Sequence, residues 1–196
     1  MSLGGYDAFD DPYAYQGTET LKNRLGLRDP AQLEAFELEM TALRANEALP
    51  AGNFDPAHFA RVHHHLFQDV YEWAGKYRTV RTSKDGNPFC FPENIRSEMK
   101  KQFAELHSGA CFKTDQPHVF IEALAHFLAE LNAIHAFREG NGRAQLSFVS
   151  LVAARCGFPL NFTRIKRETF LPAMIASYAQ DLRPLITEMT ALLIIK

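Results

Sequence analysis

The segment His-Ala-Phe-Arg-Glu-Gly-Asn-Gly-Arg at residues 135–143 combines residue types that can bind and attack a phosphate. Its Gly-Asn-Gly portion favours a tight turn, because two residues without a Cβ flank one that tolerates unusual backbone angles. Successive backbone N–H groups in such a turn can form a nest that faces an anion, and a helix starting there adds partial positive charge. Gly140, Asn141 and Gly142 are therefore candidates for an anion-binding turn.

Three side chains beside this turn have complementary chemistry. Arg143 carries a fork of donors that suits phosphate, and Glu139 carries oxygens that suit the hard cation accompanying a polyphosphate. His135 is a neighbouring group that titrates close to neutrality, so it can act as a base. Phe137 alternates with His135 and Glu139, and we expect it to point inward and anchor the loop. The set predicts attack on a nucleotide phosphate.

Other interpretations of this segment are weaker. A Walker loop needs Gly-Lys-Ser/Thr, and both it and a dinucleotide-binding fingerprint follow a strand, whereas the pattern before residue 135 is helical. A plain turn between helices would need glycine but not this density of functional residue types. A metal site at His63-His64-His65 is disfavoured, because consecutive residues on a helix point about 100° apart. We expect one of these histidines in the core and two at the surface.

Helices are expected on both sides of the loop and over most of the chain. Apolar residues recur at helical spacing over residues 117–134, and again from Phe148 to Val152 before Gly157. Asp29-Pro30 and Asp55-Pro56 each place a capping Asp before a Pro at the first helical position. The expected apolar stripes are Leu33, Phe36, Met40 and Leu43 in the first of these helices, and Phe59, Val62, Leu66, Phe67 and Val70, up to Gly75, in the second. Further helices are expected over about 92–106, 167–179 and 183–194.

One stretch of the chain favours β-structure. Residues 77–83 are rich in strand-forming types, residues 85–88 read Asp-Gly-Asn-Pro, and residues 89–91 read Phe-Cys-Phe. This pattern predicts a short hairpin with a turn at residues 85–88. The predicted fold is therefore all-α, a helical bundle with one short β-hairpin.

The 135–143 segment resembles the signature of Fic-domain proteins, commonly written HPFxxGNGRxxR, with Ala136 where Pro is usual. Residues 15–23, and residues 70–75 with Arg78, also look like segments of that family. The resemblance extends from about residue 13 to about 190. It implies a single Fic domain over residues 1–196, with a core at about 55–180 and the hairpin as a flap beside the active loop. Residues 1–20 are expected to be a loosely packed arm.

The resemblance also implies an activity, the transfer of AMP from Mg-ATP to a Tyr, Ser or Thr hydroxyl of a target protein with release of pyrophosphate. His135 would be the base, Glu139 would hold Mg²⁺, and Arg143 would contact the β-phosphate region. Gly140, Asn141 and Gly142 would form the anion hole. The flap would clamp the target by strand addition, with Thr82, Ser83, Lys84, Asp85 and Gly86 as the target-binding residues.

One position departs from the family pattern. The family has a second Arg three residues after the first, and Leu146 stands there in this chain. The resemblance implies that this second Arg would hold the γ-phosphate of ATP, and the loss of such a charge-assisted contact costs about 1.5–3 kcal/mol. A catalytically weak or inactive nucleotide-binding module is therefore an alternative. A Doc-like protein kinase is a further alternative, although Doc carries Lys where this chain has Gly142.

The expected partners also follow from the resemblance. Stand-alone proteins of this kind resemble bacterial toxins, for which a type II topoisomerase is a plausible target. Injected effectors that act on host GTPases are the other possibility. The chain lacks the family's inhibitory Ser/Thr-x-x-x-Glu helix, which predicts either a separate small antitoxin that supplies it or no control of this kind. The net charge of −2 argues against a broad grip on nucleic acid. Three scattered cysteines and the absence of a long apolar run predict a cytoplasmic protein with no membrane segment.

Overall fold

The computed structural model describes residues 11–84 and 86–194. Within these ranges the chain forms two compact units. The first comprises the described part of Met1–Ile95 together with His135–Ala144. The second comprises Arg96–Ile134 and the described part of Gln145–Lys196. The 135–143 segment therefore belongs to the unit formed by the N-terminal half of the chain, although it follows residues of the second unit in sequence.

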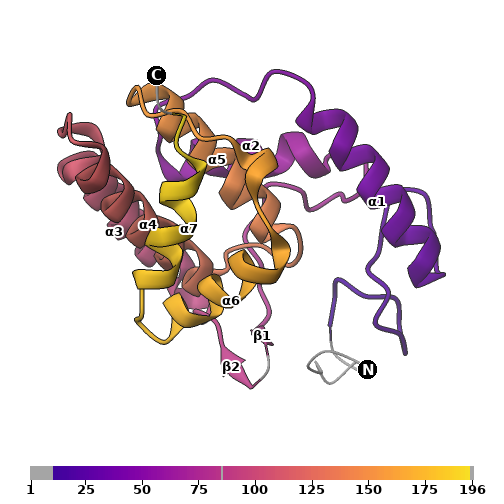
Figure 1. The fold of residues 1–196 in the computed structure, drawn as a ribbon. Helices are drawn as coiled ribbons and strands as arrows, with labels where there is room; N and C mark the ends of the chain where they lie inside the picture. Colours follow the sequence, from indigo (N-terminus) through magenta and orange to yellow (C-terminus); the bar gives the residue numbers. More distant parts are fainter. Residues whose placement is uncertain (1–10, 85, 195–196) are drawn as a thin grey trace. The chain divides into compact units, whose positions relative to one another are not determined.

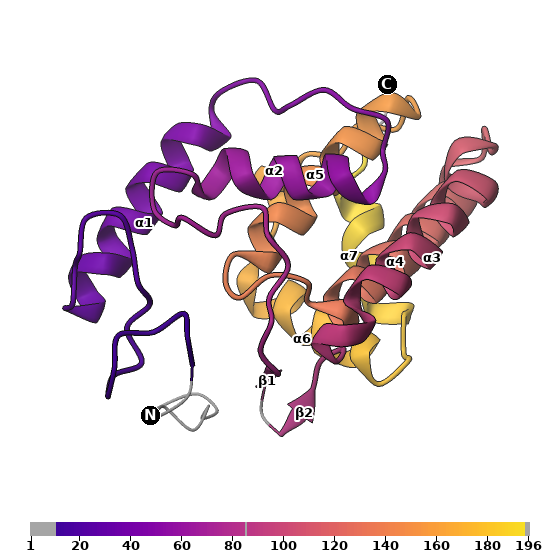
Figure 2. The same cartoon turned by 180° about the vertical axis from the view of Figure 1, so that it is seen from behind.

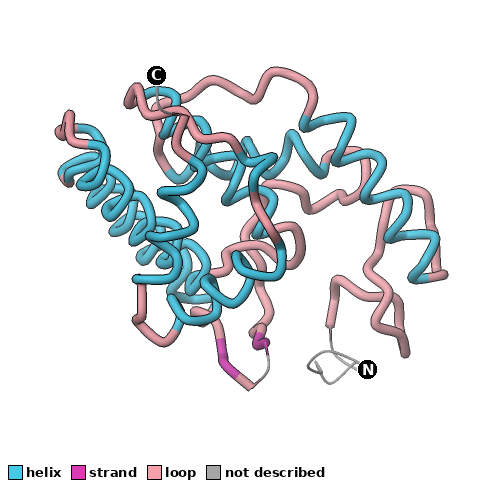
Figure 3. Tube along the Cα trace, viewed as in Figure 1, coloured by secondary structure: helices cyan, strands magenta, loops and turns pink. Residues whose placement is uncertain are grey.

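The prediction of an all-α fold with one hairpin is confirmed for the described residues (Figure 1, Figure 3). Helices and strands follow one another in an order that leaves the two strands between the second and third α-helices. The α-helices are α1 (Pro30–Ala45), α2 (Pro56–Phe67), α3 (Ile95–Ser108), α4 (Pro117–Ile134), α5 (Asn141–Arg155), α6 (Arg167–Tyr178) and α7 (Arg183–Leu192); the strands are β1 (Ser83–Lys84) and β2 (Asn87–Pro88); and the short 3-10 helices are η1 (Pro92–Asn94), η2 (Ala110–Phe112) and η3 (Phe162–Arg164).

The two predicted Asp-Pro helix starts are confirmed. The Asp29 carboxylate accepts a hydrogen bond from the Ala31 backbone N–H at 2.9 Å, and the Asp55 carboxylate accepts one from the His58 N–H at 2.6 Å. Both helices have Pro at their beginning, where its missing N–H has no intrahelical partner to lose. The predicted apolar stripe of α2 is buried throughout, but the helix ends at Phe67, and turns rather than helix lead to Gly75.

The buried face of α1 differs from the predicted stripe. Leu43 is 55% exposed, whereas Leu33 and Thr41 are buried. Glu37 lies between these two at a spacing of four residues, so that all three share one face of the helix. The apolar pattern missed this face because two of its three members are polar. The partner of Glu37 is Arg143, a residue of the 135–143 segment.

The hairpin is shorter than predicted. Ser83 pairs with Pro88 and Lys84 with Asn87, so the turn has two residues and the Asn-Pro pair belongs to β2. Gly86 has φ +80°, which suits such a turn. Beyond the strands one more backbone bond, from the Phe89 N–H to the Thr82 carbonyl at 2.9 Å, continues the pairing, and the predicted strand over residues 89–91 is absent.

The expectation of a loosely packed arm does not hold for residues 11–20. Ala14 forms an antiparallel bridge with Leu21 and is buried. The rings of Tyr13 and Trp73 pack edge to face, with their centroids 5.6 Å apart. Contacts far along the chain thus fix this segment, which composition alone cannot show. Residues 1–10 lie outside the described part.

The second unit is built around α4, as its apolar sequence predicted. α4 buries a broad apolar surface and contacts both α6 and α7. α3 runs alongside α4, as the two opposite views show (Figure 1, Figure 2). Phe103 of α3 meets Phe127 of α4 edge-on at 5.3 Å. None of the helices in the described ranges has the length and apolarity needed to span a membrane.

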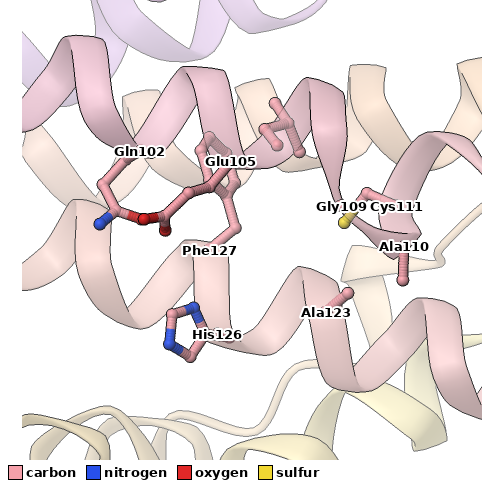
Figure 4. Close-up of a pocket in the computed structure, with 9 residues that line it drawn as sticks. Gln102, Glu105, Gly109, Ala110, Cys111, Ala123, His126 and Phe127 are labelled. Carbon is pink, nitrogen blue, oxygen red and sulfur yellow. The ribbon is translucent and has the colours of Figure 1, made fainter.

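A cavity of about 160 Å³ lies in the second unit, where α3, η2 and α4 meet (Figure 4). Glu105, Cys111, His126 and Phe127 are among its lining residues. Burial raises the pKa of the Cys111 thiol to about 12, so this cysteine stays protonated and is a weak nucleophile. The cavity contains no residue of the 135–143 segment.

Candidate active site

The 135–143 segment forms the expected turn between two helices, and Asn141 is its internal brace. α4 ends at Ile134 and α5 begins at Asn141. The Asn141 side chain is buried; its oxygen accepts from the Phe137 N–H at 2.9 Å and its amide donates to the Phe137 carbonyl at 2.8 Å. These two bonds close the loop into a fixed ring. The side chain is thereby occupied, while the first backbone N–H groups of α5 have no intrahelical acceptor.

The two glycines of the turn differ in whether the fold requires glycine at their position. Gly140 has φ +78°, and a Cβ built on it would lie 2.2 Å from the Phe67 ring. Only glycine fits there. Gly142 is exposed, and a Cβ on it would meet no atom of the described chain within 4 Å. Packing in this structure therefore does not require glycine at position 142. A glycine there does allow a ligand to approach the backbone closely.

Phe137 is fully buried and anchors the loop, as predicted. Its ring stacks on the imidazole of His63 with centroids 3.7 Å apart. The His63 Nδ1 accepts from the Gly75 N–H at 2.9 Å, so its Nε2 carries the proton and donates to the Glu139 carbonyl, also at 2.9 Å. Burial lowers the pKa of His63 to about 3. This histidine is therefore a neutral structural support for the loop.

The other two histidines of the triplet have separate partners. His64 is exposed and bonds through Nδ1 to the Ala74 carbonyl at 3.1 Å, and His65 bonds through Nε2 to the Arg44 carbonyl at 3.0 Å. The expected division into one core histidine and two nearer the surface is confirmed. In the described ranges no group of three or more His, Cys, Asp and Glu side chains is arranged to hold a metal ion.

His135 lies where the loop meets the hairpin. Its φ is +49°, an uncommon backbone conformation of the kind that clusters at functional sites. Its imidazole stacks on Phe89, with ring centroids 3.8 Å apart and planes 9° from parallel. A residue that directly follows β2 thus sets the orientation of the candidate base.

Arg78 connects the same two elements and was not predicted as a site residue. Its side chain is 2% exposed and donates to three backbone carbonyls: that of His135 at 2.7 Å, that of Val80 at 2.6 Å and that of Cys90 at 2.5 Å. Its own N–H donates to the Ala136 carbonyl at 2.9 Å. One guanidinium therefore joins both arms of the hairpin to the beginning of the loop.

A buried ion pair fixes the middle of the loop. Arg138 lies 2.8 Å from the carboxylate of Asp11, and the two side chains are 12% and 4% exposed. Sequence reasoning could not find this pair, because no periodicity links residues so far apart in the chain. The pair ties Asp11 to the active loop within the first unit.

Arg143, the motif arginine, is held by α1. Its guanidinium forms an ion pair with Glu37 and donates to the Thr41 hydroxyl at 3.2 Å. It lies over the Phe67 ring, 4.7 Å from the centroid, and within 3.7 Å of the Glu139 carboxylate. Glu139 also accepts from the Gly140 N–H at 2.7 Å. Neither Glu37 nor Thr41 was predicted, because a helix face with two polar members gives no apolar pattern.

The predicted target-binding residues of the hairpin are not equivalent. Ser83, Lys84 and Gly86 are exposed, so they can face a partner. The Thr82 side chain is buried, which places it as a support of the hairpin rather than a contact surface. Asp85 lies outside the described residues. Leu146, the departure from the family pattern, lies on α5 one turn after Arg143.

The chain is similar in sequence to known proteins over most of its length. A family model described as the Fic/DOC family matches residues 53–153. The chain is 46% identical to the probable protein adenylyltransferase y4lH of Sinorhizobium fredii over 93% of this chain and 96% of that protein. It is 34% identical to the probable protein adenylyltransferase Fic of Escherichia coli, over 89% and 88% of the two chains. The chain belongs to the Fic/DOC family.

Solved structures show the same fold. BepC, a VirB-translocated effector protein of Bartonella tribocorum whose crystal structure has AMPPNP bound, superposes with a TM-score of 0.83. The two are 26% identical, and the superposition covers 94% of this chain and 97% of that one. The protein adenylyltransferase VbhT of Bartonella schoenbuchensis is 34% identical, and this chain covers 37% of its length.

Proposed function

We propose that this protein is a protein adenylyltransferase in which the 135–143 loop binds ATP and His135 activates the acceptor hydroxyl. The observation that carries the proposal is the braced turn at the start of α5, with a histidine at one end and an arginine at the other. Relatives named protein adenylyltransferases and the AMPPNP-bound structure of BepC support ATP as the co-substrate.

The nucleotide cradle consists of backbone and one side chain. The first N–H groups of α5, at Asn141 and Gly142, face the phosphates, and the helix dipole stabilises negative charge there. The brace between Asn141 and Phe137 holds these donors in place before the nucleotide arrives. Arg143 contacts the β-phosphate region, where negative charge increases as pyrophosphate leaves.

His135 takes the proton of the target hydroxyl. The hydroxyl oxygen then forms a bond to the α-phosphorus of ATP, and the bond from that phosphorus to the β-bridging oxygen breaks. AMP is thereby attached to the target and pyrophosphate is released. The imidazole of His135 stacks on Phe89, directly after β2, and this supports a target segment bound at the hairpin as the source of the hydroxyl.

The residues present fit a magnesium ion at Glu139. Its carboxylate is 46% exposed, and Mg²⁺ is commonly bound by one or two carboxylates together with substrate phosphates. A magnesium ion held there would supply positive charge that offsets part of the charge of the nucleotide. Glu139 would hold it, while Arg143 keeps its separate contact to the nucleotide.

The target is proposed to add a strand to the hairpin. Ser83 and Lys84 of β1 are exposed, so this strand is accessible to a partner. The main-chain hydrogen bonds of an added strand fix the register of the bound segment more than they select its sequence. Such binding would present a Tyr, Ser or Thr side chain to His135.

The proposed target class is a type II topoisomerase or a GTPase. An antitoxin is the proposed inhibitor, and the cytoplasm is the proposed location. We retain residues 1–196 as one functional domain.

The first experiment tests transfer directly. Purified protein is incubated with a bacterial lysate and ATP labelled at the α-phosphate, and labelled proteins are separated on a gel. We expect a labelled band with the wild type and none with His135→Ala. If label enters a protein from ATP labelled at the γ-phosphate and not from ATP labelled at the α-phosphate, the protein is a kinase and does not transfer AMP.

The same assay distinguishes both enzyme activities from a module that binds nucleotide without transferring any part of it. Absence of any label despite normal calorimetric binding of Mg-ATP would contradict the transferase proposal. If Leu146→Arg then produced labelling, the missing second arginine would be the reason for the inactivity.

A further inference from the structure

The guanidinium of Arg143 is fixed by α1 before any nucleotide is considered. Its Nη2 is paired with Glu37, and its Nη1 donates to the hydroxyl of Thr41. The Thr41 hydroxyl can accept this bond because it donates its own hydrogen to the Glu37 backbone carbonyl at 2.8 Å. The face of the Phe67 ring supports the guanidinium plane. The side chain is nevertheless 38% exposed, so part of its fork faces solvent.

Glu37 is itself held in place. The hydroxyl of Tyr71, a residue that is 2% exposed, donates to the other carboxylate oxygen. Burial, and next the charge of Glu37, raise the pKa of Tyr71, so this hydroxyl remains a donor. The Glu37 side chain is 13% exposed.

Glu37 could either compete with a nucleotide phosphate for Arg143 or stay paired with Arg143 while the phosphate binds, and its buried environment decides between these two roles. If a nucleotide phosphate displaced Glu37 from Arg143, a largely buried carboxylate would lose its charged partner, which is strongly unfavourable. The ion pair should therefore persist when a nucleotide binds. A guanidinium has five N–H donors, so the ones not used by Glu37 and Thr41 remain available to a phosphate.

We propose that Glu37 is a positioning residue of the nucleotide site, which holds Arg143 on α1 so that its remaining donors point at the β-phosphate. This inference rests on the proposed function, because it assumes that Arg143 binds that phosphate. A long side chain fixed in advance loses less conformational entropy on binding. Leu146 makes this more important, since Arg143 has no second arginine one turn further along α5.

The test compares Mg-ADP with AMP by isothermal titration calorimetry. The two ligands share adenosine and the α-phosphate and differ in the β-phosphate, so the ratio of their affinities reports the Arg143 contact. The variants are Glu37→Ala, Arg143→Ala and the double variant, and Glu39→Ala, an exposed residue of the same helix, is the matched control. AMP affinity checks that each variant keeps its fold.

We expect Arg143→Ala to reduce the preference for ADP about 10- to 100-fold. Glu37→Ala should reduce it about 3- to 10-fold when Arg143 is present and should have no further effect when Arg143 is absent. Glu37→Gln keeps the shape and one acceptor oxygen, so its preference should lie between those of the wild type and Glu37→Ala. Glu39→Ala should leave the preference unchanged.

Three results would overturn the inference in distinguishable ways. A stronger preference for ADP in Glu37→Ala would mean that Glu37 competes with the phosphate. An equal loss with and without Arg143 would mean that Glu37 acts independently of it. No effect of Arg143→Ala would instead refute the role of Arg143 in the proposed function, on which the inference rests.

Discussion

Position 140 and position 142 show how the same residue type serves two purposes in one turn. Gly140 is required by the fold, because its positive φ and its distance from the Phe67 ring leave no room for a side chain. Gly142 has open space around it in the described structure. The motif pattern alone treats them alike, so their difference could be seen only when the residues packed around the turn were known.

Substitution by alanine should separate these two purposes. Gly140→Ala should lower the free energy of unfolding by about 2–5 kcal/mol, because it combines backbone strain with overpacking. Gly142→Ala should leave stability unchanged or slightly higher, since alanine is the better helix former, but it should weaken Mg-ADP binding. Urea unfolding and calorimetry measure the two effects. A stable Gly140→Ala variant, or unchanged ADP affinity in Gly142→Ala, would contradict this assignment.

At the scale of elements, the hairpin and the active loop are one connected structure. Arg78 bonds to carbonyls on both arms of the hairpin and to that of His135, and Phe89 stacks on the imidazole. The sequence predicted the hairpin and the loop separately, because turn residues and helix signals are local. It gave no indication that a buried arginine joins them, since the acceptors are backbone carbonyls, which every residue has.

Arg78 is accordingly expected to affect transfer more than nucleotide binding. Arg78→Lys places one ammonium where a guanidinium bonds to three carbonyls, so the hairpin and His135 should lose their fixed relation. We expect the labelling rate to fall at least about tenfold, the effect of roughly one lost hydrogen bond to a charged group, while the calorimetric affinity for Mg-ATP changes little. Arg78→Met should in addition lose about 3 kcal/mol or more of stability, because buried carbonyls lose their donor. Parallel losses of ATP affinity and labelling rate in Arg78→Lys would show that Arg78 acts on the cradle instead.

At the scale of the whole molecule, the sequence was most informative where the structure depends on near neighbours. The Asp-Pro caps of α1 and α2, the buried α4 and the turn before α5 were all predicted. The packing of residues 11–20, the buried face of α1 and the pairs Arg138–Asp11 and Arg143–Glu37 were not. Each of these depends on residues far apart in the chain, for which a single sequence has no local pattern.

His63 makes the stability of the first unit depend on pH, and this can be measured. Its pKa is lowered from 6.5 to about 3 in the folded chain, so between these values the unfolded chain binds a proton that the folded chain does not. Stability from this residue is therefore complete above about pH 6.5 and is lost as the pH falls, by up to about 1.4 kcal/mol per pH unit. Trp73 is the one tryptophan and lies in the same unit, so its fluorescence can follow unfolding in urea from pH 7 to pH 5. We expect His63→Gln to flatten this pH dependence and the exposed His118→Gln to preserve it. An equal slope in the wild type and in His63→Gln would mean that other groups cause the dependence.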